Sequence, residues 1–201
     1  MNNIGILAYG SLIEDPGIEL KPLISDRKEG IETPFNIEFA RSSRSRDGAP
    51  TVIPVEGFGA PVKAIIFALN SDIELFYAKD LLWRRETRNE SSDKHYTNPN
   101  NPKPNQVVVG VIKNSHGFKN ILFTKIGANI KSPTPRKLAK LAIDSAKSNA
   151  GRNGKDGISY LMSLKRQNIS TPLMEKYEKE ILKITNTSSL KEALSNVRKC
   201  L

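Results

Sequence analysis

The distribution of hydrophobic periodicity along the chain is the feature that most constrains its fold. Over the first two-thirds of the 201 residues, apolar side chains form short runs or alternate, as in β-strands, and one longer segment has helical spacing. The last third has helical spacing only. Strands followed by a block of helices are typical of an α+β protein, and a chain of this length can bury a substantial core. We therefore predict one domain spanning residues 1–201.

Turn residues and helix caps bound the predicted elements. Strands are expected at 5–9, 31–41, 51–55, 62–69, 106–112 and 119–126. One helix is expected from Ser71, where Glu74 completes a capping box, to about Arg88. Further helices are expected after Thr134 and Thr171, from Ile158, and after Ser189, whose capping box would include Glu192. The polar, Asn- and Pro-rich segment 89–105 is expected to form an inserted loop.

Composition indicates a globular protein of a reducing compartment. The hydrophobic share is 38%, and no apolar run has the length of a membrane span. The N-terminal apolar stretch follows no basic region, so it is interpreted as a strand and not as a secretion signal. Cys200 is the only cysteine, which excludes an internal disulfide and favours a cytoplasmic location. The sequence leaves a monomer and a homodimer open.

The net charge of +10 raises the question of an acidic partner. Basic residues are spread along the whole chain, and aromatic residues do not interleave with them as a nucleic-acid surface requires. Nucleic-acid binding therefore stays a secondary alternative.

The clearest local motif follows the first predicted strand. Residues 6–12 place an apolar run before Tyr9-Gly10-Ser11-Leu12. Gly10 lets the backbone bend sharply and lets a ligand approach, and the amides of residues 10–12 could then surround an anion as a nest. A strand followed by Gly-Ser is also an ordinary turn, so this motif alone leaves both interpretations open.

A carboxylate on the apolar face of the 71–88 helix is the second chemical feature. Leu75, Ala78 and Leu82 follow helical spacing, and Glu86 occupies the next position on the same stripe. Burial there would favour a proton-exchanging carboxyl group, as general acid–base catalysis requires. The alternative is that the stripe meets solvent at the helix end, and that Arg84 or Arg85 holds Glu86 ionised.

Other catalytic schemes find little support in the sequence. His95 and His116 lie in loop-like segments, and neither an HExxH motif nor paired cysteines are present. The serines at 42, 43 and 45 lack a nucleophile-elbow pattern. Residues 151–156 do not fit a P-loop, because Asp156 stands where Ser or Thr is required.

Three separated segments together resemble the γ-glutamylcyclotransferase superfamily. Residues 9–12 are similar to its N-terminal signature, and residues 82–86, Leu-Trp-Arg-Arg-Glu, resemble the helix that bears its catalytic glutamate. Residues 151–154, Tyr160-Leu161 and Asn168-Ile169 resemble the C-terminal part of the glutathione-acting, ChaC-like branch. The chain departs from the pattern at Trp83, where Asp is frequent, and at Asn168, where Gly is usual.

The resemblance implies a fold, a reaction and a set of site residues. The fold would be a mixed β-barrel with flanking helices, and the reaction would convert a γ-glutamyl peptide or amine, with glutathione as one candidate, to 5-oxoproline without cofactor or metal. By resemblance, Glu86 would be the general acid–base. Substrate binding would fall to Tyr9, Gly10, Ser11, Leu12 and Tyr96. The alternative is a catalytically inactive member of the fold that binds a small molecule or a protein, motivated by Trp83 and the 89–105 insertion.

Overall fold

The computed structural model describes residues 3–199 and confirms the α+β class. Within that range the chain forms two compact units, residues 3–33 with 63–127 and residues 34–62 with 128–199. The prediction of a single domain over 1–201 stays a prediction. Cys200 lies outside the described residues.

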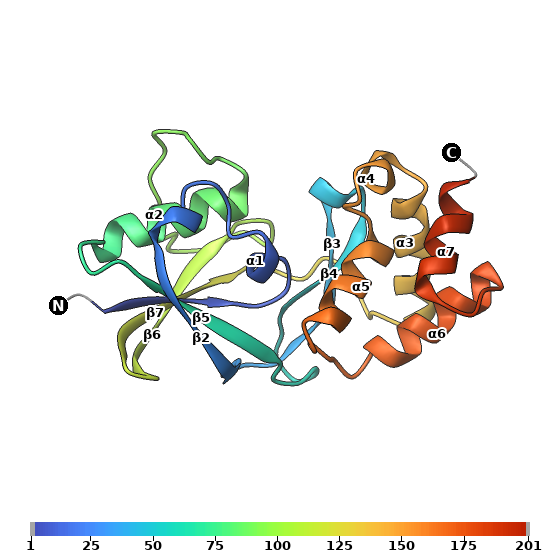
Figure 1. Cartoon of the computed structure of the whole chain (residues 1–201), viewed down its shortest axis with the longest axis horizontal. Coiled ribbons are helices and arrows are strands. Elements are labelled where there is room, and N and C mark those ends of the chain that lie inside the picture. The colour runs from blue at the N-terminus through green and yellow to red at the C-terminus, as the bar shows by residue number, and fades with distance from the viewer. Residues whose placement is uncertain (1–2, 200–201) are drawn as a thin grey trace. The chain divides into compact units, whose positions relative to one another are not determined.

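The first unit contains a five-stranded mixed sheet with strand order β2-β5-β1-β7-β6 (Figure 1). Its strands are β1 (Ile4–Ala8), β2 (Ile24–Glu32), β5 (Lys63–Leu69), β6 (Val108–Ser115) and β7 (Phe118–Lys125). The central strand β1 runs antiparallel to β5 and parallel to β7, so Ile6 lies opposite Phe67 on one side and Leu122 on the other. All five residues of β1 are buried, as its continuous apolar sequence predicts.

The helix α2 (Leu75–Thr87) packs on one face of this sheet (Figure 1). Alternate residues of β1, Ile4, Ile6 and Ala8, form a buried cluster with the inner face of α2, which includes Ala78 and Leu82. A short helix, α1 (Ser11–Glu14), follows β1, and a 3-10 turn, η1 (Lys21–Leu23), precedes β2. This packing holds α2 against β1. The candidate site includes residues of α2 and of the turn that follows β1.

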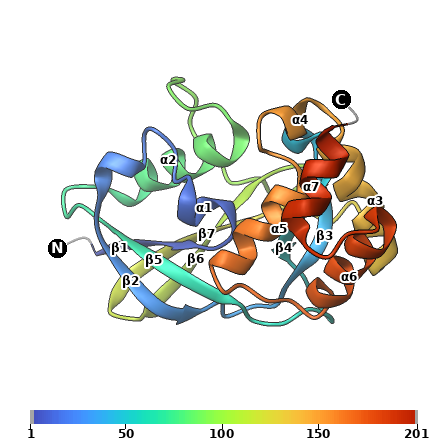
Figure 2. The same ribbon diagram turned by 45° about the vertical axis from the view of Figure 1, so that its right-hand side comes forward.

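The second unit contains a two-stranded sheet and the C-terminal helices (Figure 2). The hairpin strands are β3 (Ile37–Ser43) and β4 (Ala49–Pro54), joined by the 3-10 turn η2 (Arg44–Arg46). The helices are α3 (Pro135–Ala146), α4 (Asn149–Arg152), α5 (Gly157–Arg166), α6 (Met174–Thr185) and α7 (Leu190–Arg198). Phe39 of β3 packs edge-on against Tyr177 of α6 with ring centroids 5.1 Å apart, so strand and helix share one core. The helical last third of the chain is confirmed.

The structure corrects the expected barrel. Among the described residues the five-stranded sheet is open, with β2 and β6 as its edges, and β3 and β4 form a separate sheet. The strand expected over 31–41 is in fact the end of β2 and the start of β3. Pro34 lies between them, and proline has no N–H to continue a strand ladder. The chain leaves the first unit at this point.

The predicted helix caps have mixed outcomes. The Thr134 and Ser189 hydroxyls accept bonds from Lys137 N and Glu192 N, as expected. The box at Ser71 is wrong, because α2 begins at Leu75 and Glu74 occupies the cap position without a side-chain bond. The chain turns at Asn70, whose carbonyl accepts a bond from Ile73 N, and this turn delays the helix. Across residues 3–199, no helix combines the length and the hydrophobicity needed to traverse a bilayer.

Replacing Tyr177 with Phe is expected to stabilise the protein by about 1 kcal/mol. The Tyr177 hydroxyl is buried and has no hydrogen-bond partner within the described residues, and burial raises its pKa well above the ordinary value. Removing this unpaired group therefore removes a desolvation cost. Urea unfolding would measure the change. Tyr96→Phe is the opposing control, because the Tyr96 hydroxyl has two hydrogen-bond partners and its loss should destabilise the fold. A destabilised Tyr177→Phe variant would contradict this prediction.

Candidate active site

The turn after β1 has the conformation that its sequence predicts. Gly10 has φ 60° and ψ −134°, a combination that side chains with a Cβ avoid, and it caps the start of α1. Its carbonyl accepts a bond from Ile13 N, and Leu12 is buried in the core of the first unit. Tyr9, just before the turn, is half-buried. The sharp bend at Gly10 is confirmed, whereas anion binding by the amides of residues 10–12 stays a prediction.

Glu86 lies in the last turn of α2 and is half-buried. The side chain of Glu86 is 24% exposed, so the apolar stripe expected along α2 meets solvent at this position. Its Oε1 accepts a hydrogen bond of 2.5 Å from Nη1 of the neighbouring Arg85. This ion pair is the arrangement that the sequence left open as the alternative to a buried, unpaired carboxyl group.

Arg85 is buried and connects Glu86 to the segment that follows the Gly10 turn. Its Nε and Nη2 donate to the carbonyl oxygen of Asp15 at 3.0 and 2.5 Å, while Nη1 donates to Glu86. One planar guanidinium can hold two acceptors in a fixed geometry in this way. A single side chain thus links the Glu86 carboxylate to Asp15, three residues after the Tyr9–Leu12 motif.

Arg84 holds the same segment at a second point. Its Nε donates to Glu19 at 2.9 Å, and this hydrogen-bonded carboxylate raises the pKa of the Arg84 guanidinium above its usual value. Glu19 N in turn donates to Glu90, just beyond α2. The loop 15–19 is therefore fastened to the end of α2 by two buried arginines and one glutamate.

Gly17 lets this loop pass close to α2, and Gly17→Ala is expected to destabilise the protein by about 2–4 kcal/mol. Gly17 has φ +90°, and a Cβ there would lie 2.8 Å from Cγ of Arg85 and collide with the Glu90 carboxylate. The matched control is Gly30→Ala, because Gly30 has φ +72° but no atom within 4 Å of its Cβ position. Urea unfolding of both variants would separate the cost of backbone strain, which both share, from the cost of the steric overlap, which only Gly17→Ala creates. Equal losses would show that the close approach contributes nothing.

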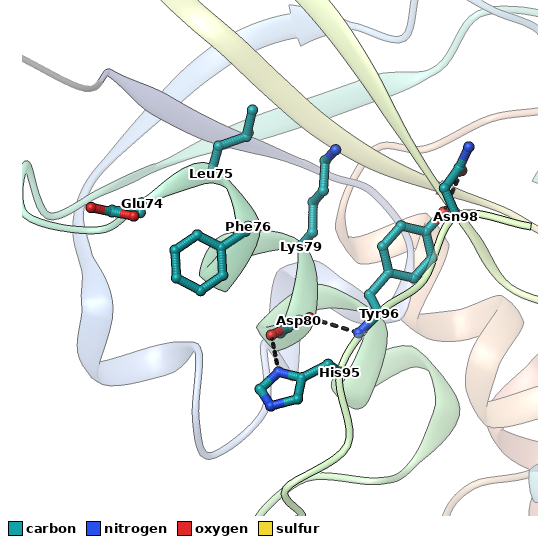
Figure 3. Close-up of a pocket in the computed structure, with 8 residues that line it drawn as sticks. All are labelled: Glu74, Leu75, Phe76, Lys79, Asp80, His95, Tyr96 and Asn98. Atoms are coloured by element: carbon teal, nitrogen blue, oxygen red, sulfur yellow. Dashed lines mark hydrogen bonds and ion pairs between the residues drawn. The ribbon is translucent and has the colours of Figure 1, made fainter.

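A pocket of about 750 Å³ lies beside the first half of α2 (Figure 3). Asp80 of α2, itself buried, accepts bonds of 2.7 Å from His95 Nδ1 and from Tyr96 N. These bonds fasten the 89–105 segment, which is irregular as predicted, to the helix. The His95 side chain is 75% exposed, and it lines the pocket together with Tyr96 and Lys79.

Tyr96 lies in this pocket and not beside Glu86. Its hydroxyl donates to Asn98 at 2.9 Å and accepts from Val109 N at 3.0 Å. Its ring packs against Trp83 with centroids 6.4 Å apart. The residues predicted to bind substrate therefore fall in two places. Tyr9–Leu12 belong to the Gly10 turn, and Tyr96 lines the pocket that contains Asp80 and His95, which we call the Asp80 pocket.

Sequence reasoning missed the buried charges of α2. Asp80, Arg84 and Arg85 are all buried, whereas the sequence singled out Glu86. Asp80 and Arg84, which carry opposite charges and are spaced i, i+4 on one side of the helix, were the available signal. Across residues 3–199, no three His, Cys, Asp or Glu side chains gather in a way that could hold a metal ion.

Comparison of the chain with protein-family models and with curated proteins finds no match.

Proposed function

We propose that this chain is a γ-glutamylcyclotransferase-like enzyme that releases 5-oxoproline from a γ-glutamyl peptide or amine. The observation that carries the proposal is the Arg85 bridge, which joins the Glu86 carboxylate to Asp15, three residues after the Tyr9–Leu12 motif. Two segments that resemble the family's signature and catalytic helix are therefore neighbours in the first unit.

The conformation of Asn168 also supports the resemblance. Asn168 has φ 55°, in the left-handed region that glycine and asparagine adopt most readily. The Asn at this position, where Gly is usual in the family, therefore adopts a backbone conformation that is also open to Gly. Tyr160 and Leu161, from the adjoining part of the resemblance, are buried residues of α5.

The proposed reaction is an internal acyl transfer. The α-amine of the γ-glutamyl group attacks its own γ-carbonyl carbon, a C–N bond forms, and the bond to the leaving amine breaks. Glu86 takes a proton from the α-ammonium, which makes the amine nucleophilic, and transfers it to the leaving nitrogen. The second proton that the attacking nitrogen loses as the lactam forms follows the same route, so the leaving group departs as an ammonium and protons balance without a co-reactant. Nucleophile and electrophile belong to one molecule, so the protein mainly has to hold the folded conformer.

Arg85 would position the proposed catalyst. Its hydrogen bond to Glu86 would hold the carboxyl group in one orientation, and its bonds to Asp15 restrict the Arg85 side chain. The amides of the Gly10 turn would bind a substrate carboxylate, since backbone N–H groups in such a turn can surround an anion.

The second candidate is a non-catalytic member of the fold that binds a small molecule or a protein. Two observations favour it: Glu86 is ion-paired with Arg85, and the lining of the pocket of about 750 Å³ includes Asp80, His95 and Tyr96 but not Glu86. In this candidate the Asp80 pocket would be the binding site.

Release of 5-oxoproline from a panel of γ-glutamyl compounds tests the two candidates. The panel contains glutathione, a γ-glutamyl amino acid and a γ-glutamyl amine, and product is measured by chromatography. Product from any compound supports the enzyme, and the best substrate identifies the leaving group. No product from the whole panel supports the binding module.

A further inference from the structure

The second unit contains a separate cavity of about 490 Å³, and the inference drawn from it does not depend on the proposed function. Its lining is largely apolar and comes from four segments of that unit. The residues that matter here are Glu38, Ala40, Phe58, Ala128, Ile130 and Leu173. Cavities of this size commonly hold small organic molecules.

Backbone hydrogen bonds to β3 fix two walls of the cavity. The 57–59 turn, with Gly57 and Gly59 both at positive φ, is attached where Ile37 N donates to Ala60 O at 2.8 Å. The 128–130 segment is attached where Asn129 N and Ile130 N both donate to Ala40 O at 3.1 Å. The cavity is therefore built on rigid attachments and exists without a ligand.

Glu38 is the one carboxyl group in the lining, and it is 1% exposed. Its Oε1 accepts bonds from Phe39 N at 2.9 Å and from the Thr171 hydroxyl at 2.5 Å, and its Oε2 accepts from Leu173 N at 3.0 Å. A carboxylate offers about four acceptor positions, so one remains on Oε2. In the part of the chain that the structure describes, Glu38 forms no ion pair with a basic side chain.

A buried carboxylate that is held by hydrogen bonds alone is stabilised further when a positive charge lies next to it. The neutral donors from Phe39, Thr171 and Leu173 satisfy hydrogen bonds, but they do not supply a countercharge. Glu38 belongs to the lining of the cavity, so a ligand bound there lies next to this residue. Phe58, which is 42% exposed, adds an aromatic ring to the same lining, and aromatic rings attract cations.

We propose that this cavity binds a small primary ammonium compound with an apolar body. The ammonium group donates to the free acceptor position of Glu38 Oε2, and the apolar body lies against Ile130 and Leu173. The site selects against anions, because a second negative charge beside Glu38 would be repelled. It also discriminates against neutral isosteres, which bring no countercharge.

Isothermal titration of the full chain with benzylamine, benzyl alcohol and benzoate tests the proposal. These three probes have nearly the same size and differ in charge. We expect saturable binding of benzylamine, binding of benzyl alcohol that is at least about tenfold weaker, and no binding of benzoate. Absence of benzylamine binding, or equal affinity for the alcohol, would overturn the proposal and leave Glu38 as a cap for the start of α6.

Two variants locate the binding. Ala128→Phe adds bulk at an exposed residue of the lining, and it should weaken benzylamine binding about tenfold or more without touching Glu38. Ser195→Phe adds the same bulk at an exposed residue of α7 outside the lining, and it should leave binding unchanged. Unchanged binding in Ala128→Phe would place the site elsewhere.

Glu38→Gln tests the charge directly. It should bring the affinities for benzylamine and benzyl alcohol close to each other, because the countercharge is gone. If this variant does not fold, the Ala128→Phe result and the comparison of the three probes still decide whether the cavity binds the ammonium compound. None of these measurements uses 5-oxoproline release, so failure here and failure of the proposed enzyme activity are distinguishable.

Discussion

The Glu86→Gln variant is expected to lose 5-oxoproline release by about 10²-fold or more in kcat. Glutamine keeps the shape of the side chain and an oxygen that can accept the Arg85 hydrogen bond, but it cannot take or return a proton. The effect should therefore appear in kcat and leave KM nearly unchanged, since proton transfer is lost and substrate binding is not. Steady-state kinetics on the best substrate of the γ-glutamyl panel measure both parameters.

Glu32→Gln is the matched control for this experiment. Glu32 is an exposed carboxylate at the end of β2 in the same unit, so its substitution makes the same change of charge away from the site. Its kinetics should equal those of the unmodified protein. Equal product from Glu86→Gln and from the unmodified protein would remove Glu86 as the catalyst and leave the enzyme proposal without its acid–base group.

Arg85→Met is expected to reduce the free energy of unfolding by about 2–4 kcal/mol. The buried guanidinium makes two bonds to the Asp15 carbonyl and one to Glu86, and methionine fills similar space without any of them. The Asp15 carbonyl and the half-buried Glu86 carboxylate would then lose their partner. Urea unfolding measures the stability. If Glu86 is the catalyst, kcat should also fall by about tenfold or more, because the carboxylate is no longer oriented.

Arg88→Met provides the comparison for Arg85. Arg88 also lies near Asp15, but its ion pair spans 3.8 Å and its side chain is 45% exposed. Its loss should change stability by less than about 0.5 kcal/mol, as is usual for solvent-exposed pairs. Similar losses for the two variants would mean that the Arg85 bridge contributes no more than a surface ion pair. Arg85→Lys should rescue only part of the stability, because one ammonium cannot reproduce the fork that reaches both acceptors.

The elements that sequence reasoning located well are those governed by neighbours in the chain. The Thr134 and Ser189 caps depend on residues three positions away, and the bend at Gly10 depends on one residue's freedom to adopt positive φ. The apolar run of β1 was sufficient to predict a strand buried on both faces. In contrast, the Ser71 box failed because a competing turn at Asn70 uses the same stretch of chain.

The arrangement of strands required contacts that no local pattern contains. Residues 31–41 alternate as one strand would, yet β2 pairs with β5 in the first unit and β3 pairs with β4 in the second. The alternation determines which side of a strand faces the core, but it does not specify the partner strand. For the same reason the sequence could not show that the five-stranded sheet remains open.

The sequence by itself determined the α+β class, the helical last third, the sharp bend at Gly10 and the place of Glu86 near the end of a helix. Each of these follows from periodicity or from the backbone preference of one residue. Only the tertiary structure decided which charges are buried and what they contact. Arg84 meets Glu19 across 65 residues of chain, and Arg85 meets Asp15 across 70. The free energy of such contacts depends on desolvation and on exact donor geometry, and the folded backbone alone brings both about.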